Sequence, residues 1–473
     1  MFAPPMTNRR ALLLLILLGT LTRLAFAWGL GLGIDESYMI TAGRGAFRLG
    51  YFDHPLVSWW LSHGIAVLTG SEAPIVVRLP FIALCALSTW LMARIGTGLA
   101  TERAGLWAAL AFNLSPLFGI TSGSWVLPDG PLIAALLTAT LCLLHALPSR
   151  AGWGWWLGAG AAIGLAMLSK YTAVLAVAGF GFYLLTEPTH RRWLLRPQPY
   201  VAGLLAALVF SPVIIWNAEN GWASLAFQGG RAAAAKFHPF GPLVVFAGES
   251  AFLAPWIWAG LMLVFWQGWR QRAQWRVWLL CCLAAPPILL FAVVALWSPQ
   301  VLFHWAAPGY LMLFPLLGIW LDRQSWAPRA ARINAAVLVV AMALVVAVLR
   351  LPGLPIPPAS LLQARDWTEL GPALRGYGLP IAATSWSAAG KVGIGLGPDV
   401  PVYCLNPDAR EFRFSTTPPH SGDILIVAPQ HTLAQMQKTY GWGLFFRIDE
   451  MPSVRVDGAD ISIFIGRDLK GWP

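Results

Sequence analysis

Two clusters of acidic side chains near the N-terminus have the residue types for catalysis or ion binding. Asp35 and Glu36 are adjacent and follow the first apolar run, and Asp53 is followed by His54 and a proline. Adjacent carboxylates at a membrane boundary could act as a general base or bind an ion. An acid beside an imidazole could bind a divalent cation or a phosphate. Solvated loop acids and an ordinary turn remain the alternatives for these two motifs.

Asp129 and Lys170 each border an apolar stretch. Asp129 follows Pro128 at the start of such a stretch, where it could cap a helix or take part in function. Lys170 interrupts about thirty apolar residues, which form one long helix or two spans meeting at an outer turn. A lysine buried there is costly unless it pairs with an anionic headgroup or snorkels to the interface.

Two further candidates are basic groups among aromatic residues. Arg231 lies in a segment from about 216 to 242 that also holds Trp222, Phe227 and Gln228, a composition typical of an interfacial segment. Its cations could hold a lipid phosphate or only anchor the chain to anionic lipid. His304 lies between Phe303 and Trp305, in a short loop before another apolar run. A lone histidine is more often structural than functional.

The elements that position these residues are predicted to be membrane helices. Hydrophobic residues make up 57% of the chain and charged residues 11%, whereas soluble domains carry about 25% charged residues. We predict about eleven spans, and we interpret the first as a retained anchor rather than a cleaved signal peptide. The predicted spans cover residues 11–30, 74–93, 104–122, 131–147, 154–169, 172–186, 200–216, 244–266, 277–297, 306–321 and 333–350.

The basic residues predict the orientation of these spans. With the N-terminus in the cytoplasm, the inner loops collect most of the arginines, including Arg9, Arg103, Arg276 and Arg323. The outer loops then hold most of the acids and the candidate residues. The net charge of +11 is explained by this sidedness, and no basic-aromatic module for nucleic acid is present. The sequence also lacks the Walker, GxSxG, CxxC and HExxH motifs.

A separate domain is predicted after Arg350. A proline-rich linker at 351–358 cannot continue a helix. Residues 351–473 then have the pattern of a small α/β domain, which an odd number of spans places outside the cytoplasm. Strands are predicted at 381–384, 400–403, 423–428 and 461–465, and helices at 361–375 and 431–440. Cys404 is the only cysteine in this domain, so no disulfide within it is expected.

The order of these motifs resembles the polyprenyl-phosphate-sugar glycosyltransferases of the GT-C fold. That group includes protein O-mannosyltransferases and lipid A aminoarabinosyltransferases. The resemblance covers most of residues 1–350, as a transmembrane glycosyltransferase domain, and extends to Asp366-Trp367 and 402–406 in the tail. It implies an α-helical polytopic membrane protein of GT-C type with a small extracytoplasmic α/β domain.

The resemblance also implies roles for the candidate residues. Asp35 matches the catalytic acid and Glu36 its neighbour. It assigns Asp53, His54, Asp129, Lys170 and Arg231 to substrate binding. His304 is a further substrate-binding candidate, from its place in an outer loop rather than from the resemblance. His54 replaces a lysine of the aminoarabinosyltransferases, and Leu56 replaces a proline of many relatives, so the phosphate contact in this loop need not be identical. Asp53 and His54 are also the metal candidates, since a divalent cation is one alternative for this loop.

The implied reaction is an inverting transfer from a polyprenyl-phosphate-linked sugar to a lipid or glycan acceptor of the cell envelope, such as lipopolysaccharide. The expected location is a bacterial inner membrane, with the C-terminal domain in the periplasm. Membrane lipids are expected partners and nucleic acids are not. The alternatives are a protein O-mannosyltransferase and, from another class, a transporter or flippase of lipid-linked sugars. A transporter needs polar residues through the centres of its spans, whereas the candidates here gather near the outer ends.

Overall fold

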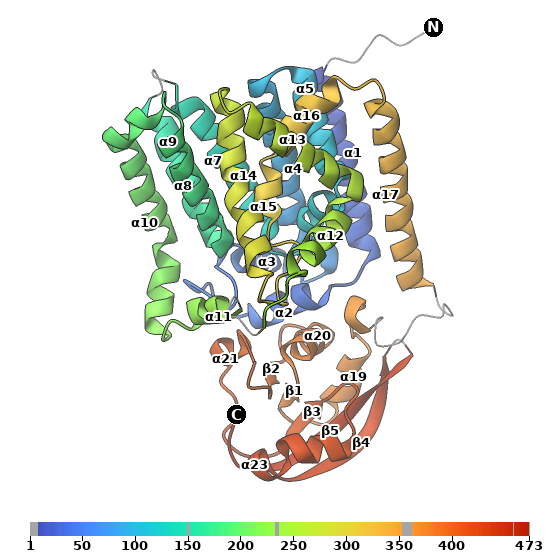
Figure 1. Ribbon diagram of the computed structural model, residues 1–473. Helices are drawn as coiled ribbons and strands as arrows, with labels where there is room; N and C mark the ends of the chain where they lie inside the picture. Colours follow the sequence, from blue (N-terminus) through green and yellow to red (C-terminus); the bar gives the residue numbers. More distant parts are fainter. Residues whose placement is uncertain (1–7, 149–151, 232–235, 352–361, 457, 473) are drawn as a thin grey trace. The chain divides into compact units, whose positions relative to one another are not determined.

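The computed structural model describes residues 8–148, 152–231, 236–351, 362–456 and 458–472. The chain divides into two compact units (Figure 1). The first unit comprises residues 1–25, 49–58 and 79–341, and the second comprises 26–48, 59–78 and 342–473. Two segments of the first predicted outer loop therefore group with the C-terminal part of the chain. The functional boundary at residue 350 stays a prediction.

The first unit is helical. Three long helices begin or end in it and continue into the second unit: α1 (Asn8–Gly29), α4 (Pro74–Leu99) and α17 (Ala327–Arg350). The others are α5 (Glu102–Leu114), η1 (Pro116–Thr121), α6 (Ser122–Ser124), α7 (Asp129–Ala146), α8 (Trp153–Ser169), η2 (Tyr171–Ala173), α9 (Val174–Thr186), η3 (Arg191–Leu195), α10 (Pro197–Glu219), α11 (Ala223–Arg231), α12 (Gly241–Leu253), α13 (Pro255–Arg270), α14 (Trp275–Val294), α15 (Ala307–Leu311) and α16 (Phe314–Asp322).

The protein is a multi-pass membrane protein, because several of these helices are long and apolar enough to cross a bilayer. By length and composition, α1, α4, α7, α10, α14 and α17 qualify, and the number within the described residues rises from 6 to 8 if each of two bent pairs is one span. The predicted count of eleven stays a prediction.

Two expected spans are not straight helices. Residues 104–122 bend by 81° between α5 and η1, and residues 244–266 bend by 114° between α12 and α13. Each break precedes a proline, Pro116 or Pro255, which cannot donate the next helical hydrogen bond. At the second break Ala254 also has a φ of 75°, a left-handed conformation that ends α12.

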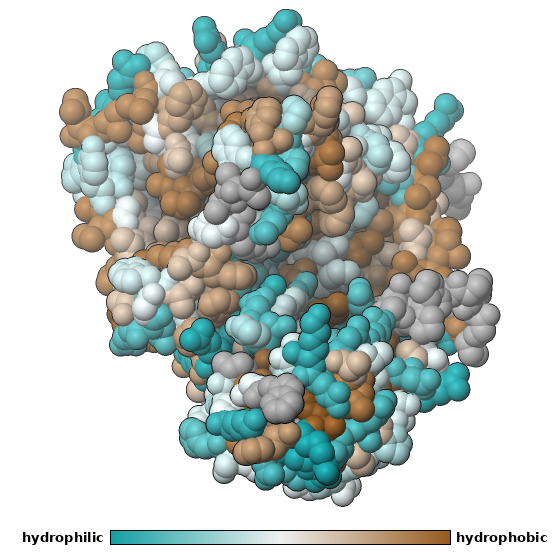
Figure 2. Space-filling model, turned by 60° about the horizontal axis from the view of Figure 1, so that its bottom comes forward, coloured by the Kyte–Doolittle hydropathy of each residue, from teal (hydrophilic) through white to brown (hydrophobic). Residues whose placement is uncertain are grey.

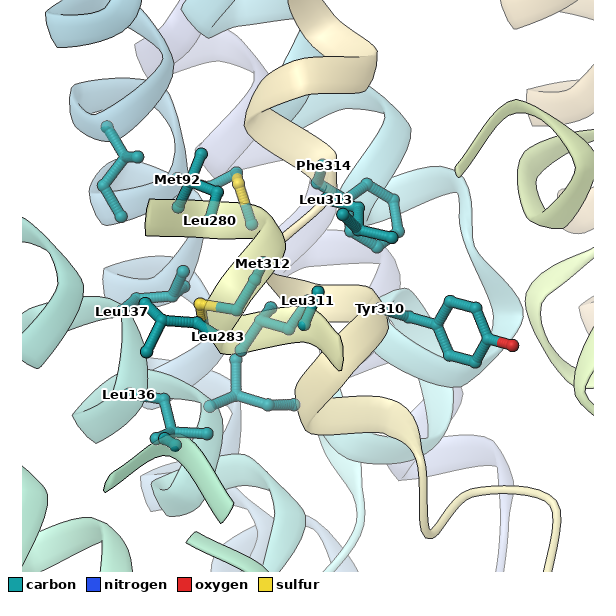
Figure 3. Packing of buried hydrophobic residues seen from close by; sticks show 14 of the residues in the cluster. Met92, Leu136, Leu137, Leu280, Leu283, Tyr310, Leu311, Met312, Leu313 and Phe314 are labelled. Carbon is teal, nitrogen blue, oxygen red and sulfur yellow. The ribbon is translucent and has the colours of Figure 1, made fainter. Parts of the chain in front are cut away.

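The core of the first unit is apolar and lies between α4, α5, α7, α14 and the α15–α16 pair. Figure 3 shows its centre, where Leu136 and Leu137 of α7 pack near Leu280 and Leu283 of α14. Small residues let the helices approach closely: a Cβ on Gly318 would come within 2.4 Å of the Ala104 carbonyl oxygen. Close backbone approach at small residues is the usual way in which membrane helices associate.

The second unit combines helices with a mixed sheet. Its helices are α2 (Ile34–Ala42), most of α3 (Val57–Thr69), α19 (Leu370–Arg375), α20 (Trp386–Leu396), α21 (Phe412–Ser415), α22 (Leu433–Met436), η4 (Gln437–Gly441) and α23 (Trp442–Leu444). Its strands are β1 (Ile381–Ala383), β2 (Val402–Cys404), β3 (Ile424–Val427), β4 (Phe445–Val456) and β5 (Ala459–Leu469).

The sheet order is β2-β1-β3-β5-β4, with β1 parallel to β2 and β3, and β5 antiparallel to β3 and β4. Figure 2 shows many hydrophilic side chains on the surface of this sheet-bearing part and more hydrophobic ones over the helices. The predicted small α/β domain is thus confirmed as a fold class.

The four predicted strands are present within a residue or two of their expected positions, except that β5 extends from 459 to 469. The sequence analysis missed β4, whose burial alternates irregularly, and α20, which is rich in small residues. The predicted helix at 361–375 is interrupted: residues 362–364 are helical, and α19 covers its last part. Residue 361 and the linker at 352–358 lie outside the described residues. The predicted helix at 431–440 is divided into α22 and η4.

A surface charge cluster joins β5 to its neighbours and predicts a pH effect. Arg467 donates to Asp423 at 2.6 Å and to Asp449 at 2.8 Å, and these hydrogen bonds lower the pKa of both carboxyls. A carboxylate with a lowered pKa stabilises the fold above its unfolded pKa of about 3.9. We expect Arg467→Gln to lower the melting temperature at pH 7, with the difference from wild type shrinking as the pH falls below about 4.

The measurement is fluorescence-detected melting of the full chain in detergent at pH 7 and pH 3. Arg455→Gln is the matched control, because Arg455 is an exposed arginine of β4 outside this cluster. An Arg467→Gln effect of the same size at both pH values would contradict the prediction.

Candidate active site

Asp129 and Lys170 form a buried ion pair in the first unit. The Lys170 Nζ lies 2.9 Å from Oδ1 of Asp129, and both side chains are 8% exposed. Asp129 is the first residue of α7, and Pro128, which cannot cap by its side chain, occupies the N-cap position. The interpretation of Asp129 as an N-cap is therefore wrong. Its carboxylate instead accepts a hydrogen bond from the buried lysine.

Lys170 is positioned by the end of a helix. α8 ends at Ser169, and Lys170 adopts an extended backbone with φ −155° while its N–H still donates to the Ala166 carbonyl oxygen. The chain then enters η2 and α9, so the apolar stretch of thirty residues is two helices that meet at this turn. The turn directs the lysine inward to Asp129 rather than outward to the lipid interface.

Two histidines lie near this pair. His304 and His54 both interact electrostatically with the Asp129 carboxylate, and both side chains are partly buried. The structure thus brings together four of the predicted residues from four separate segments of the chain. Imidazole and ammonium groups around one buried carboxylate form a site that can donate several hydrogen bonds to a phosphate.

The loop that carries Asp53 is held by the segment around α11. Gln228 donates from its amide Nε2 to the Asp53 carbonyl oxygen at 2.5 Å, and the rings of Phe52 and Phe227 lie 4.8 Å apart. Asp53 itself is 3% exposed. Near the other end of α11, Ser224 and Tyr171 share a hydrogen bond of 2.6 Å. The interfacial segment therefore links the Asp53 loop to the turn that carries Lys170.

Arg231 is the last residue of α11, and its side chain lies outside the part of the chain that the structure describes. Its role stays a prediction. The metal candidates, Asp53 and His54, are not part of a larger ligand set, since the described residues contain no group of three or more His, Cys, Asp or Glu arranged to hold a metal ion.

The adjacent acids Asp35 and Glu36 belong to the second unit and have different surroundings. Glu36 is 2% exposed and pairs with Arg78 through hydrogen bonds of 2.8 Å from Nε and 2.5 Å from Nη2. It also accepts the Gly33 N–H at 2.8 Å, which caps the start of α2. Asp35, in the same first turn, has an exposed side chain. The geometry therefore assigns Glu36 to holding α2 and leaves Asp35 accessible to a substrate.

Arg78 is the residue of this site that the sequence analysis missed. Besides Glu36, it donates to the backbone carbonyl oxygens of Ala27, Leu30 and Gly31 at 2.7–3.1 Å. It thereby fixes the end of α1 and the turn into α2. A lone arginine inside a predicted span was the available signal, because such a charge is costly unless it is paired.

α2 is fixed on its other face by α20. A Cβ on Gly390 would come within 2.6 Å of the Tyr38 backbone, so only glycine permits this approach, and Thr41 donates to the Gly390 carbonyl oxygen at 2.9 Å. Asp366 accepts the Leu32 N–H at 2.8 Å. Burial raises the pKa of the Asp366 carboxyl, and that N–H acts in the opposite direction. The backbone that presents Asp35 is thus held at several points within its own unit.

A substitution of Glu36 tests how much the buried Glu36–Arg78 ion pair stabilises the fold. We expect Glu36→Gln to lower the free energy of unfolding by about 3–5 kcal/mol, because it leaves the Arg78 charge buried without a compensating carboxylate. Glu72→Gln is the matched control, since Glu72 also pairs with an arginine, Arg44, but both side chains are 15–18% exposed. Thermal melting in detergent measures both. Equal losses in the two variants would show that burial does not decide the strength of these pairs.

Comparisons with known proteins agree with this architecture. Residues 53–216 match the family model described as dolichyl-phosphate-mannose-protein mannosyltransferase. The chain is 25% identical over 306 residues to the lipid A galacturonosyltransferase RgtD of Rhizobium johnstonii, an alignment that covers 61% of this chain and 60% of that protein. The chain therefore matches less than two thirds of the length of this curated relative.

Solved structures show the same fold over nearly the whole chain. ArnT from Cupriavidus metallidurans, bound to undecaprenyl phosphate, matches with a TM-score of 0.67 at 15% identity, covering 96% of this chain and 97% of that one. An oligosaccharyltransferase of Archaeoglobus fulgidus matches with a TM-score of 0.50 at 12% identity, covering 85% and 64%. The chain therefore has the GT-C fold, and its predicted resemblance to the glycosyltransferases that use polyprenyl-phosphate-linked sugars is confirmed.

Proposed function

We propose that the protein is a membrane glycosyltransferase that moves a sugar from a polyprenyl-phosphate donor to lipid A or a related envelope glycolipid. The observation that carries this proposal is the 306-residue similarity to a lipid A galacturonosyltransferase. The buried Asp129–Lys170 pair with two histidines beside it supports the proposal, since a phosphate leaving group needs such donors. The proposed location is a bacterial inner membrane, with the reaction on the periplasmic side.

The proposed reaction is a single inverting displacement. An acceptor hydroxyl oxygen attacks the anomeric carbon, and the bond from that carbon to the phosphate oxygen breaks. The phosphate leaves with the bonding electron pair and remains on the polyprenyl chain. Asp35 accepts the proton of the hydroxyl, the role of a general base within hydrogen-bonding reach of the acceptor. The exposed position of Asp35 on a fixed helix suits this role.

Lys170 is proposed to stabilise the leaving phosphate. One hydrogen bond of its ammonium group goes to Asp129, and an ammonium has three donors, so two remain for phosphate oxygens. Asp129 keeps the lysine oriented before the substrate arrives. Preorganised cations that face developing negative charge are typically the largest catalytic contribution. His54, His304 and Arg231 are proposed as further contacts to the donor.

A protein acceptor is the second candidate, because the matching family model describes protein mannosyltransferases. A test of the acceptor is mass spectrometry of envelope glycolipids and of periplasmic proteins from cells with and without the protein. We expect a lipid A species that is heavier by one sugar residue and depends on the protein. Sugar gained only by proteins would replace the lipid acceptor with a protein acceptor. No change in either fraction would contradict transfer.

A flippase predicts a different result. Vesicles that contain the purified protein and a polyprenyl-phosphate-linked sugar, but no acceptor, would exchange the lipid between leaflets. We expect no protein-dependent exchange there and product only when lipid A is added. Exchange without product would favour the transporter.

A further inference from the structure

A pair of adjoining cavities lies in the first unit, away from Asp129 and Lys170. No candidate catalytic residue lines either cavity. The first cavity, of 640 Å³, lies between α5, α13, α16 and α17 and is almost wholly apolar, with Trp107, Trp256 and Trp326 in its walls. The second, of 530 Å³, is polar and lies between α13, α14 and α16. Both volumes fall in the range of about 300–1,000 Å³ that is typical of ligand pockets.

The two cavities adjoin along the same helices. Trp320 of α16 lines both of them. Gly260 and Leu263 of α13 line the apolar cavity. Gln267 of α13 and Gln271, which follows the end of this helix, lie about one and two turns beyond Leu263 and line the polar cavity. A ligand that occupies both must therefore be apolar over most of its length and polar at one end.

The polar cavity favours an anion. It is lined by Arg276 and Arg323 together with glutamine side chains. The acid next to Arg323 in sequence, Asp322, is already paired with Arg103 at 2.7 Å. Within the described chain no acidic residue lines this cavity, so its charge is positive and complementary to a phosphate.

The position of the cavities separates them from the candidate active site. The polar cavity lies where α13 and α16 end and where α14 begins, and the apolar cavity lies beside the first halves of α13 and α17, whereas Asp129 and Lys170 lie at the start of α7 and the end of α8. Figure 1 places α5, α13 and α16 together at one end of the first unit and α11 at the other. The arginine distribution of the sequence predicts that the cavity end faces the cytoplasm.

We propose that these cavities bind one anionic phospholipid of the cytoplasmic leaflet. Its phosphate headgroup contacts Arg276 and Arg323, and one acyl chain fills the apolar cavity beside α17. Basic pockets between membrane helices on the cytoplasmic side are typical sites for anionic headgroups. The site is independent of the proposed sugar transfer and would couple the protein to the composition of its membrane.

The test is native mass spectrometry of the delipidated full-length protein with added phosphatidylglycerol or phosphatidylcholine. We expect one phosphatidylglycerol to bind in preference to phosphatidylcholine. The double variant Arg276→Gln/Arg323→Gln should weaken this binding about tenfold or more, since it removes both headgroup cations. Ala330→Phe should also weaken it, because Ala330 lines the apolar cavity and a larger side chain occupies the space of the acyl chain.

Arg272→Gln is the control, because Arg272 is exposed in the turn between α13 and α14 and lines neither cavity. It should bind phosphatidylglycerol as the wild type does. Melting curves check that every variant is folded. Equal binding of the two lipids, or unchanged binding in the folded double variant or in folded Ala330→Phe, would overturn the proposal. Binding of inorganic phosphate without any binding of phosphatidylglycerol would also overturn it, because the polar cavity would then be a site for free phosphate alone.

Discussion

Asp35→Asn is expected to reduce sugar transfer by about 10²- to 10⁴-fold, the usual contribution of a general base. The amide keeps the size of the side chain and can no longer accept the proton of the acceptor hydroxyl. The loss should appear in kcat, with little change in the KM for the donor, because Asp35 acts on the acceptor. Steady-state transfer from a polyprenyl-phosphate donor to lipid A measures it.

Two other variants, Glu36→Gln and Asp399→Asn, distinguish a catalytic effect of Asp35→Asn from an effect on folding. The exposure of Asp35 predicts an unchanged melting temperature in Asp35→Asn, whereas Glu36→Gln should melt earlier. Asp399→Asn is the matched control, because Asp399 is another exposed aspartate of the second unit. Near-normal transfer by folded Asp35→Asn would remove Asp35 from the mechanism.

Lys170→Met is expected to reduce transfer by about 10²- to 10³-fold, the cost of removing one preorganised donor from developing negative charge. The variant also leaves Asp129 buried without its lysine, which should destabilise the protein by about 3–5 kcal/mol. Two further variants separate these effects. Lys170→Arg keeps the charge and should recover part of the rate, although its planar group has a different geometry.

The double variant Asp129→Asn/Lys170→Gln replaces the ion pair with neutral groups of similar size. It should be more stable than Lys170→Met, because no buried charge remains unpaired, and yet it should transfer sugar as poorly. The measurements are melting temperature and transfer rate for the three variants. Normal transfer by the double variant would show that the pair has only a structural role.

The sequence predicted the fold class and indicated candidate site residues because both depend on local signals. Apolar runs and arginine positions indicate membrane helices and their sidedness without knowledge of contacts. Lys170 was singled out because a charge in an apolar run is costly, and the structure gives it the buried partner that this cost demands.

The remaining features depend on contacts between distant residues. Nothing around Glu36 indicates that its carboxylate turns toward Arg78, 42 residues away, rather than toward solvent as Asp35 does. The bends before Pro116 and Pro255 were missed because hydropathy averages over a window and does not register a break. α20 was missed because its three glycines, two of which pack closely against α2, have low helix propensity.

We predict that Asp35, Asp53, Asp129 and Lys170 act in one cavity. A comparison of kcat in the single and double variants of Asp35 and Lys170 tests this prediction. If Asp35 and Lys170 act on the same displacement, their combined loss in kcat should be smaller than the product of the single losses, as is usual for residues that act as a unit.

Sugar transfer from a lipid phosphate can be measured by reconstitution of the purified protein. Proteoliposomes receive polyprenyl-phosphate-linked galacturonic acid, or donors with other sugars, together with lipid A and no nucleotide. We expect release of polyprenyl phosphate in equal amounts with glycosylated lipid A, inversion at the anomeric carbon seen by NMR, and loss of both products in Asp35→Asn. Product with retained configuration, or release of polyprenyl phosphate that is unchanged in Asp35→Asn, would contradict this expectation.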